Sequence, residues 1–366
     1  MKSKLENRKL EDSEIKKAMS CCKMPRDLSG LYRSLEKTAI RLSASWEEYG
    51  RPLHHGIEYP LFRFSHNLSQ NISNKKNVLI ISAGIHGEEP AGSFAIKYGL
   101  NGIAEAATKR GLGLIVYPCV NPSGFEHNTR YNADNEHPNN DFVRYQKMNG
   151  EWVDDLKSDV KAVRDWKWSA DAPLDKPLPK ETLYLLKDLK RLEHQGILSR
   201  VSGLIDIHQD DFRKDMGTYA YVFGDRTRYA GLMEKFPEEL GIPLLRNKEV
   251  SSGYRTEVDG TGGIVSGDSI DSMYPQQNLY SQQNFRVIHS PDQTLGPRTD
   301  GQGLLTRYDG SLCDLFDHLG TKISVTIETT TTVPLAKAIM VNWMWIKHVM
   351  ELIQGKNGAH YSKSHK

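Results

Sequence analysis

The sequence predicts an α/β protein: a single domain with a mixed, largely parallel, twisted sheet that has helices on both faces. Two observations support this class. Apolar runs at residues 78–81 and 204–207 are typical of strands covered on both faces. Between residues 78 and 120 the pattern passes from strand to helix to strand, the order that produces parallel pairing. Because such sheets bind ligands at the carboxyl ends of their strands, we expect the site there.

The other elements are assigned in chain order from their residue patterns. Residues 1–50 are predicted as a helical accessory segment, and residues 357–366 as a polar tail. Between them we expect strands at 57–64, 112–120, 203–208 and 323–327, helices at 91–107, 183–194 (capped by Glu181 or Thr182) and 333–353, and an irregular polar loop at 126–142.

Two stretches have little periodicity and are predicted as insertions. Residues 143–178 contain Trp152, Trp166 and Trp168, which we expect to pin the insertion to the body of the protein. Residues 251–303 are rich in Gly, Ser, Gln and Asn. A long irregular segment in a compact domain is either disordered or functional, and this one is placed to rim the site.

Composition narrows the class of partner. The 366 residues carry a net charge of +2 without a long basic run, so no nucleic-acid or membrane partner is expected and the substrate is predicted to be small. The four cysteines suggest no disulfide framework, which fits a reducing compartment. The charged amino terminus lacks a following apolar stretch. A cytoplasmic location is therefore expected.

Candidate metal ligands stand at the ends of the two buried strands. His86 and Glu89 follow the first strand and can converge on one ion from a turn, and imidazole with carboxylate is a donor set that zinc accepts. His208 ends the second strand and would supply the third ligand. A period of two places Asp206 on the same strand face, where it could orient His208. A strand-end histidine without metal is the simpler alternative.

Five ordered motifs together carry a resemblance. They are His86-Gly87-Glu88-Glu89-Pro90, Asn121-Pro122-Ser123-Gly124, Arg130 with Asn132-Ala133-Asp134-Asn135, Asn139-Asn140-Asp141-Phe142 and Pro179-Lys180-Glu181-Thr182. With these motifs the chain is similar to the zinc carboxypeptidase family, particularly its compact bacterial members such as the murein tripeptide amidases, from about residue 78 to 353.

The resemblance implies a carboxypeptidase-like domain over residues 51–356, one zinc ion per chain and a role for each site residue. Glu328 would be the general base, although alone a strand-end glutamate is more often solvent-exposed. Arg130 would stabilise the oxyanion, and Asn139 would bind substrate. Tyr308 is either the tyrosine that caps the substrate site or an ordinary packing residue.

The chain departs from the family at Asn140, where an arginine that grips a substrate carboxylate is usual. A guanidinium binds carboxylate better than an amide does, so the substrate class is open, with Arg144, Arg213 or Arg255 as substitutes. We expect a metallocarboxypeptidase-type hydrolase that cleaves a terminal peptide or isopeptide bond. The alternatives are an acyl-amino-acid amidohydrolase similar to succinylglutamate desuccinylase and aspartoacylase, and a non-catalytic binding protein with the same fold.

Overall fold

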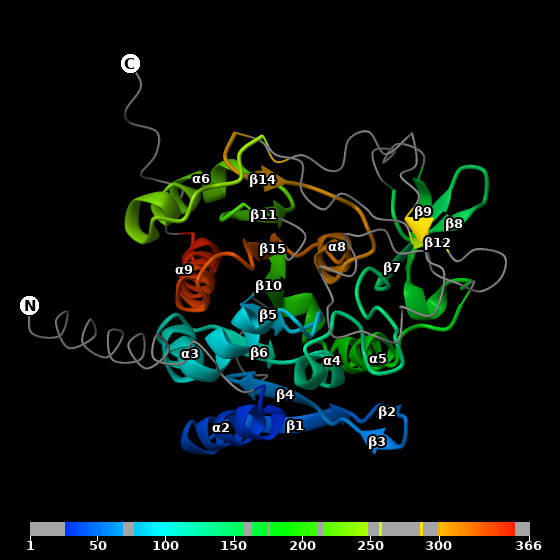
Figure 1. The fold of residues 1–366 in the computed structure, drawn as a ribbon, viewed down its shortest axis with the longest axis horizontal. Helices are drawn as coiled ribbons and strands as arrows, with labels where there is room; N and C mark the ends of the chain where they lie inside the picture. The colour runs from blue at the N-terminus through cyan, green and yellow to red at the C-terminus, as the bar shows by residue number, and fades with distance from the viewer. Residues whose placement is uncertain are drawn as a thin grey trace, which may run out of the picture.

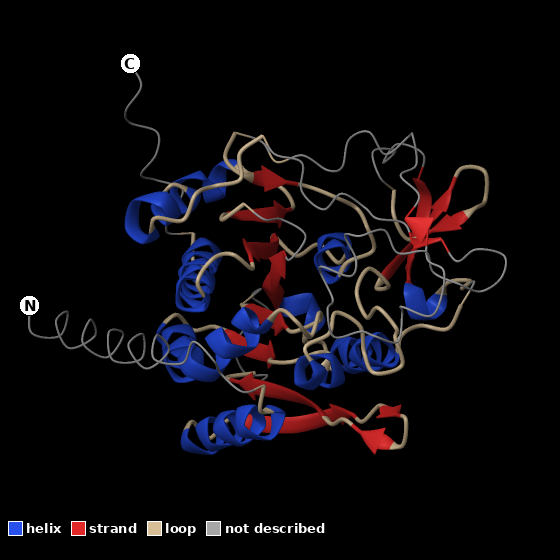
Figure 2. Cartoon of the chain, in the orientation of Figure 1, coloured by secondary structure: helices blue, strands red, loops and turns tan. Residues whose placement is uncertain are grey.

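An eight-stranded sheet forms the centre of the protein, with helices packed on both faces (Figure 1, Figure 2). The computed structural model describes residues 26–68, 77–156, 163–174, 176–210, 215–247, 256–257, 286–287, 299 and 301–355. In spatial order the strands are β1 (Ser45–Gly50), β4 (Leu61–His66), β6 (Gly113–Tyr117), β5 (Val78–Ala83), β10 (Val201–Asp210), β15 (Ile323–Thr330), β11 (Thr218–Val222) and β14 (Leu304–Leu305).

The sheet is mixed, as predicted, with its parallel part in the middle. Strands β6, β5, β10 and β15 run parallel to one another. Strands β1 and β4 pair antiparallel on one side, and β4 is antiparallel to β6. On the other side β11 is antiparallel to β15 and parallel to β14. The carboxyl ends of β5, β10 and β15 therefore meet at one edge.

The two faces of the sheet are covered by different helices. Helices α2 (Leu28–Arg41), α3 (Pro90–Lys109), α6 (Thr227–Met233) and α9 (Leu335–Ile353) lie on one face. Helices α5 (Lys180–His194) and α8 (Leu312–His318) lie on the other, and Figure 1 shows α9 and α8 on opposite sides of β15. Alternate residues of β5 divide between the layers: Leu79 and Ile81 pack towards α3 and α9, whereas Val78 and Ile80 pack towards α5 and α8.

The structure corrects three boundaries. Residues 45–50, assigned to the helical amino-terminal segment, form the edge strand β1, and only α2 of that segment is described as helical. The strand expected at 57–64 is a short hairpin of β2 (Leu53–His54) and β3 (Ile57–Glu58), then β4. Pro60 separates the two because proline cannot donate to a ladder. Helix α5 starts at Lys180 behind Pro179, so neither Glu181 nor Thr182 caps it.

The first insertion contains a separate three-stranded sheet. It consists of β7 (Val143–Lys147), β8 (Trp152–Val153) and β9 (Val163–Trp168). Trp168 is buried in the core under the sheet, and the Trp166 ring stacks on His318 of α8 at 4.8 Å between centroids. These two tryptophans pin the insertion to the body of the protein, as predicted. The Trp152 ring instead contacts Lys167, another residue of the insertion.

Most of the predicted second insertion lies outside the described residues, which include there only β12 (Thr256–Glu257), β13 (Arg286–Val287), Thr299 and residues 301–303. The polar tail also lies outside them. The predicted core helix near the carboxyl terminus is α9, which packs on the sheet as expected. No helix in the described part of the chain has the length and apolarity that a membrane crossing requires. Cys119 and Cys313 are free, buried thiols.

Candidate metal centre

The turn between β5 and α3, residues 84–89, carries the candidate ligands His86 and Glu89, and we call it the metal-ligand turn. Gly84 leaves the strand with φ of +67°, and Glu89 is the residue before Pro90, the first residue of α3. Gly87 packs so closely on helix α4 (Pro122–His127) that a Cβ there would lie 1.9 Å from the carbonyl carbon of Gly124. Only glycine fits at that approach. The turn places the side chains of His86 and Glu89 over the end of the sheet.

The donor groups of three side chains converge at this edge. Nδ1 of His86 lies 2.7 Å from Oε1 of Glu89 and 3.2 Å from Nδ1 of His208, and Nδ1 of His208 lies 3.0 Å from Oε2 of Glu89. All three residues are buried. Tetrahedral zinc with bonds of about 2.0–2.1 Å holds its donors about 3.3 Å apart, so the triangle has the right scale and chemistry for that ion. Among the described residues this is the one cluster of metal-binding side chains.

Each ligand is oriented by a further contact. Nε2 of His208 lies 3.1 Å from Oδ2 of Asp206, as the strand periodicity predicted. The backbone N–H of Gln209 donates to Oε2 of Glu89 at 3.0 Å. Nε2 of His86 lies 3.0 Å from Nε2 of His137. These contacts leave the Nδ1 atoms of both histidines facing the triangle.

Charge within the cluster sets the protonation of the ligands. Burial lowers the pKa of His86 to about 4, and Arg130 acts in the same direction. Burial would raise the pKa of Glu89, but His86 and His208 outweigh it and hold that pKa well below its ordinary range. Burial would lower the pKa of His208, but Asp206 and Glu89 outweigh it and raise that pKa. An ionised Glu89 and a neutral His86 are the forms that bind metal.

Glu328 lies beside the triangle on the neighbouring strand. In the parallel pairing of β10 and β15 it stands opposite His208. Its Oε2 atom is buried, and none of the described residues hydrogen-bonds to it. Burial raises the pKa of Glu328 well above its ordinary range, His208 opposes the shift, and Glu89 and Asp210 add to it. A carboxylate with a raised pKa is suited to accept a proton near neutral pH.

Arg130 reaches the cluster from the loop after α4. Its Nη1 atom donates to Oε1 of Glu88 and to Oε1 of Glu89, both at 3.2 Å. The guanidinium therefore lies next to a candidate metal ligand, and the Arg130 side chain is largely covered. A fixed positive charge in this place can stabilise negative charge that develops on a substrate oxygen.

The residues predicted to bind substrate are placed less directly. Asn139 and Asn140 lie in the loop that leads into β7, and Oδ1 of Asn139 is buried without a hydrogen-bond partner among the described residues. Tyr308 packs edge-on against Phe223 with centroids 5.3 Å apart and lies near His318. Its role at the substrate stays a prediction.

Of the three arginines considered as substitutes for Asn140, one is described. Arg144 is buried, and its Nη1 lies 3.8 Å from Oδ2 of Asp154. Arg213 and Arg255 lie outside the described residues.

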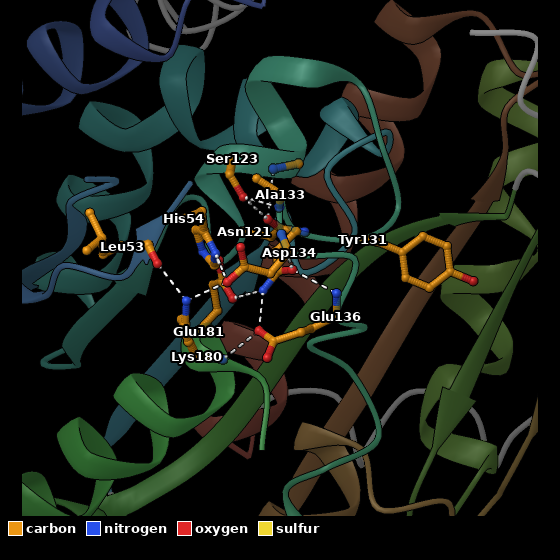
Figure 3. Close-up of polar contacts among 12 residues, drawn as sticks. Leu53, His54, Asn121, Ser123, Tyr131, Ala133, Asp134, Glu136, Lys180 and Glu181 are labelled. Carbon is orange, nitrogen blue, oxygen red and sulfur yellow. Dashed lines mark hydrogen bonds and ion pairs between the residues drawn. The ribbon is translucent and has the colours of Figure 1, made fainter. Parts of the chain in front are cut away.

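A hydrogen-bonded network anchors the loop between α4 and β7, which carries Arg130, Asn139 and Asn140 (Figure 3). Nε2 of the buried His54 lies 2.7 Å from Oε1 of Glu181, and Nδ1 lies 2.9 Å from Oδ2 of Asp134. Asn132 donates to Oε2 of Glu181 at 2.6 Å. We call the following set the loop-anchoring network: His54, Asn132, Asp134, Glu136, Lys180 and Glu181. It joins the β2–β3 hairpin, the loop and the start of α5, and so fixes the stretch between Arg130 and Asn139.

The sequence pattern did not single out His137 or the contacts of the loop-anchoring network, although Asn132, Asp134, Lys180 and Glu181 stand in the motifs that carry the resemblance. His137 lies in a polar loop without periodicity, and only its position two residues before Asn139 could have drawn attention to it. Glu181 was predicted as a helix cap, but it is fully buried and pairs with His54 across 127 residues of sequence. A contact of that separation has no local signature.

Comparison with known proteins gives a family and a fold. The sequence model of the succinylglutamate desuccinylase/aspartoacylase catalytic domain matches residues 75–262, slightly more than half of the chain. A comparison with curated proteins gives no match. Three crystal structures of candidate metallopeptidases share the fold, from Shewanella baltica OS155 (TM-score 0.58, 17% identity), Shewanella amazonensis SB2B (0.55, 19%) and Shewanella denitrificans OS217 (0.55, 17%). Each covers 90% of this chain, which covers 93%, 94% and 91% of those chains, respectively.

Proposed function

Because the chain belongs to the succinylglutamate desuccinylase/aspartoacylase catalytic-domain family, we propose that it is a zinc-dependent hydrolase of an amide bond in a small substrate. The observation that carries the proposal is the triangle of donor atoms from His86, Glu89 and His208, with Glu328 beside it in strand register. One zinc ion per chain and a cytoplasmic location are parts of the same proposal.

The side chains of the site divide the work of hydrolysis. When bound, zinc would supply Lewis acidity towards water and towards the amide carbonyl. Glu328 takes a proton from the attacking water, the new carbon–oxygen bond forms, and the same proton passes to the leaving nitrogen as the carbon–nitrogen bond breaks. Arg130 stabilises the negative charge on the carbonyl oxygen. None of the described residues hydrogen-bonds to the buried Oε2 atom of Glu328, which supports the role of this residue as the proton acceptor.

Two substrate classes are supported by different observations. Family membership favours an acyl-amino acid, in which the amide joins a short acyl group to an amino acid. The interval from Arg130 to the Asn139-Asn140 pair, which resembles that of zinc carboxypeptidases, favours a short peptide with a terminal or isopeptide bond. Both substrates present an amide next to a carboxylate, and both are compatible with the same metal chemistry.

A substrate panel on the purified zinc-loaded protein tests the function. Acetyl- and succinyl-amino acids, dipeptides and γ-linked peptides would be compared by following amine release. Preferential hydrolysis of the acyl-amino acids would identify a deacylase, and preferential hydrolysis of the peptides would identify a carboxypeptidase-type enzyme. Zinc binding without hydrolysis of either class would support a binding protein and contradict the proposal.

A further inference from the structure

We propose that Arg26 is a positioning residue of the metal centre, which holds the turn between two of the ligands. Nη2 of Arg26 donates to the carbonyl oxygen of Glu88 at 2.9 Å, and Nη1 donates to the carbonyl oxygen of Gly87. These carbonyls belong to two of the three peptide groups that link His86 to Glu89. Because their orientation sets the directions of the two ligand side chains, the guanidinium fixes the geometry of the donor atoms. The inference rests on the proposed zinc site.

Arg26 is itself held in place. It precedes Asp27, whose Oδ1 accepts a hydrogen bond from the N–H of Gly30 at 2.8 Å and caps α2. Helix α2 is anchored by Leu31 and Leu35, both fully buried in the layer that contains α3. The guanidinium carbon lies 5.7 Å from the centroid of the Phe125 ring on α4. The fixed start of α2 therefore holds the guanidinium of Arg26 in place. Little conformational entropy is lost when its two Nη atoms donate to the carbonyl groups.

The charge of Arg26 is retained in this setting. Burial lowers the pKa of Arg26 to about 10, and the carboxylate of Glu88 opposes that shift. The side chain is positively charged at neutral pH, so its hydrogen bonds to the carbonyls are of the stronger, charge-assisted kind. Removing it would leave two polar carbonyl groups without these donors.

Two contacts hold the turn. Arg26 donates to its carbonyl groups, and the backbone of α4 packs against Gly87. The side chain of Glu88 also accepts from Arg130. A change in the peptide groups of the turn therefore reaches both the ligands and the oxyanion-stabilising arginine.

This contact comes from outside the region that the family model matches, which starts at residue 75. The segment before the sheet was predicted as accessory, yet its residue at position 26 touches the metal-ligand turn. We infer that this part of the amino-terminal segment completes the site of this chain.

The test uses Arg26→Ala and Arg26→Lys, with Arg33→Ala as control. Arg33 lies on α2 and is exposed, and within the described part of the chain its Nε donates to the carbonyl oxygen of Ser29, one helical turn earlier. Hydrogen exchange of the peptide that covers residues 84–91 is measured on the metal-free proteins, and zinc affinity is measured by competition with a chromophoric chelator. We expect Arg26→Ala to exchange at least about tenfold faster in that peptide and to bind zinc about ten- to a hundredfold more weakly.

The outcomes separate positioning from general stability. Faster exchange spread equally over β5, β10 and β15 in Arg26→Ala would mark a merely structural role and overturn the proposal, as would parent-like exchange and zinc affinity. Should Arg26→Ala fail to fold, Arg26→Lys decides, because it keeps the charge but loses the two-pronged fork: a several-fold weaker zinc affinity is expected, and parent-like affinity would overturn the inference. If the parent protein itself bound no zinc, the proposed function would fail, and the local exchange of residues 84–91 would still decide the role of Arg26.

Discussion

Nε2 of His208 lies 3.1 Å from Oδ2 of Asp206, two residues earlier on the same strand. The contact uses the ring nitrogen that faces away from the ligand triangle, so Nδ1 is the atom left for the metal. Asp206 is buried, and its charge raises the pKa of His208 against the effect of burial. A histidine that is oriented in this way binds metal with the correct nitrogen without reorganisation.

Removing a histidine ligand should remove the metal. We expect His86→Ala and His208→Ala each to purify with less than about a tenth of the zinc of the parent, because a catalytic zinc needs three protein ligands. Metal content per chain is measured by elemental analysis after dialysis. His55→Ala, which changes a side chain that is 73% exposed, is the control and should keep its zinc. Near-full zinc in both ligand variants would refute the metal centre.

Glu328→Gln tests the general base. Glutamine keeps the shape and much of the hydrogen bonding of glutamate but cannot accept the proton of water, so turnover should fall at least about a hundredfold while zinc is retained. The measurement is kcat on the best substrate of the panel, together with metal content. Glu58→Gln, on an exposed side chain of the β2–β3 hairpin, should match the parent. Activity of Glu328→Gln within a few-fold of the parent would assign the base to another group.

His137→Leu tests the contact behind the first ligand. The rings of His86 and His137 are parallel within 8°, with centroids 5.0 Å apart and Nε2 atoms 3.0 Å apart. This separation is too long for face-to-face packing and fits a hydrogen bond in the common ring plane. Leucine cannot make that bond, so zinc affinity should fall about ten- to a hundredfold.

The control for this variant is His127→Leu, an exposed position on α4. Both variants are titrated with zinc against a chelator. Equal affinities for the two would show that His137 does not orient the ligand.

The sequence was sufficient to predict the sheet class, the convergence of His86, Glu89 and His208, and the contact of Asp206 with His208, because each has a local signature. Buried strands are visible in the sequence as apolar runs, and parallel strands bring their carboxyl ends together. The strand pattern alone therefore predicts that His86 and His208 lie at one edge of the sheet. Asp206 followed from the period of two. Glu328 was reached only through the family resemblance, since its own strand-end position is ordinary.

The remaining features depend on long-range pairing. Strand β1 joins the sheet through its register with β4, which no periodicity within residues 45–50 reveals. Arg26 contacts carbonyl groups that are 61 and 62 residues away in the sequence. Because these acceptors belong to the backbone, the side chains at positions 87 and 88 give no sign of the contact. His54 and Glu181 pair across 127 residues of sequence. Such contacts are fixed by the tertiary fold and leave no pattern at either partner.

The buried pair of His54 and Glu181 should make stability depend on pH. Burial lowers the pKa of His54, but Glu181 and Asp134 outweigh it and raise that pKa above the ordinary value. The protonated form is therefore favoured by folding: its contribution is complete below the unfolded pKa of about 6.5 and is lost as the pH rises through the folded pKa. We expect the free energy of unfolding to decrease over that interval.

His54→Gln should remove part of this dependence. The variant is expected to be less stable than the parent at pH 6 and to approach it as the pH rises, as measured by urea denaturation across that range. His55→Gln, at the exposed neighbouring position, should keep the profile of the parent. Parallel profiles of His54→Gln and the parent would show that His54 does not titrate with folding.

Asn140 is where the chain departs from the zinc carboxypeptidases that it resembles, and the backbone conformation of this residue affects any test of the substitution. Its φ is +64°, a left-handed conformation that asparagine tolerates better than arginine. Asn140→Arg should therefore lower the free energy of unfolding by about 1 kcal/mol. Asn135 has φ of +66° in the same loop and is exposed, so Asn135→Arg is a matched control that carries the strain without the predicted substrate role.

Selectivity then separates the two explanations of the missing arginine. If carboxylate recognition depends on a guanidinium at position 140, the parent should discriminate weakly between a substrate and its carboxyl-amidated analogue. Asn140→Arg should then sharpen the preference about ten- to a hundredfold, because a charge-assisted pair in a desolvated pocket contributes about 1.5–3 kcal/mol. Asn135→Arg should not change it. Strong parental preference for the free carboxylate, unimproved by Asn140→Arg, would mean that another cationic side chain already takes this role, and Arg144→Ala is the next variant to measure.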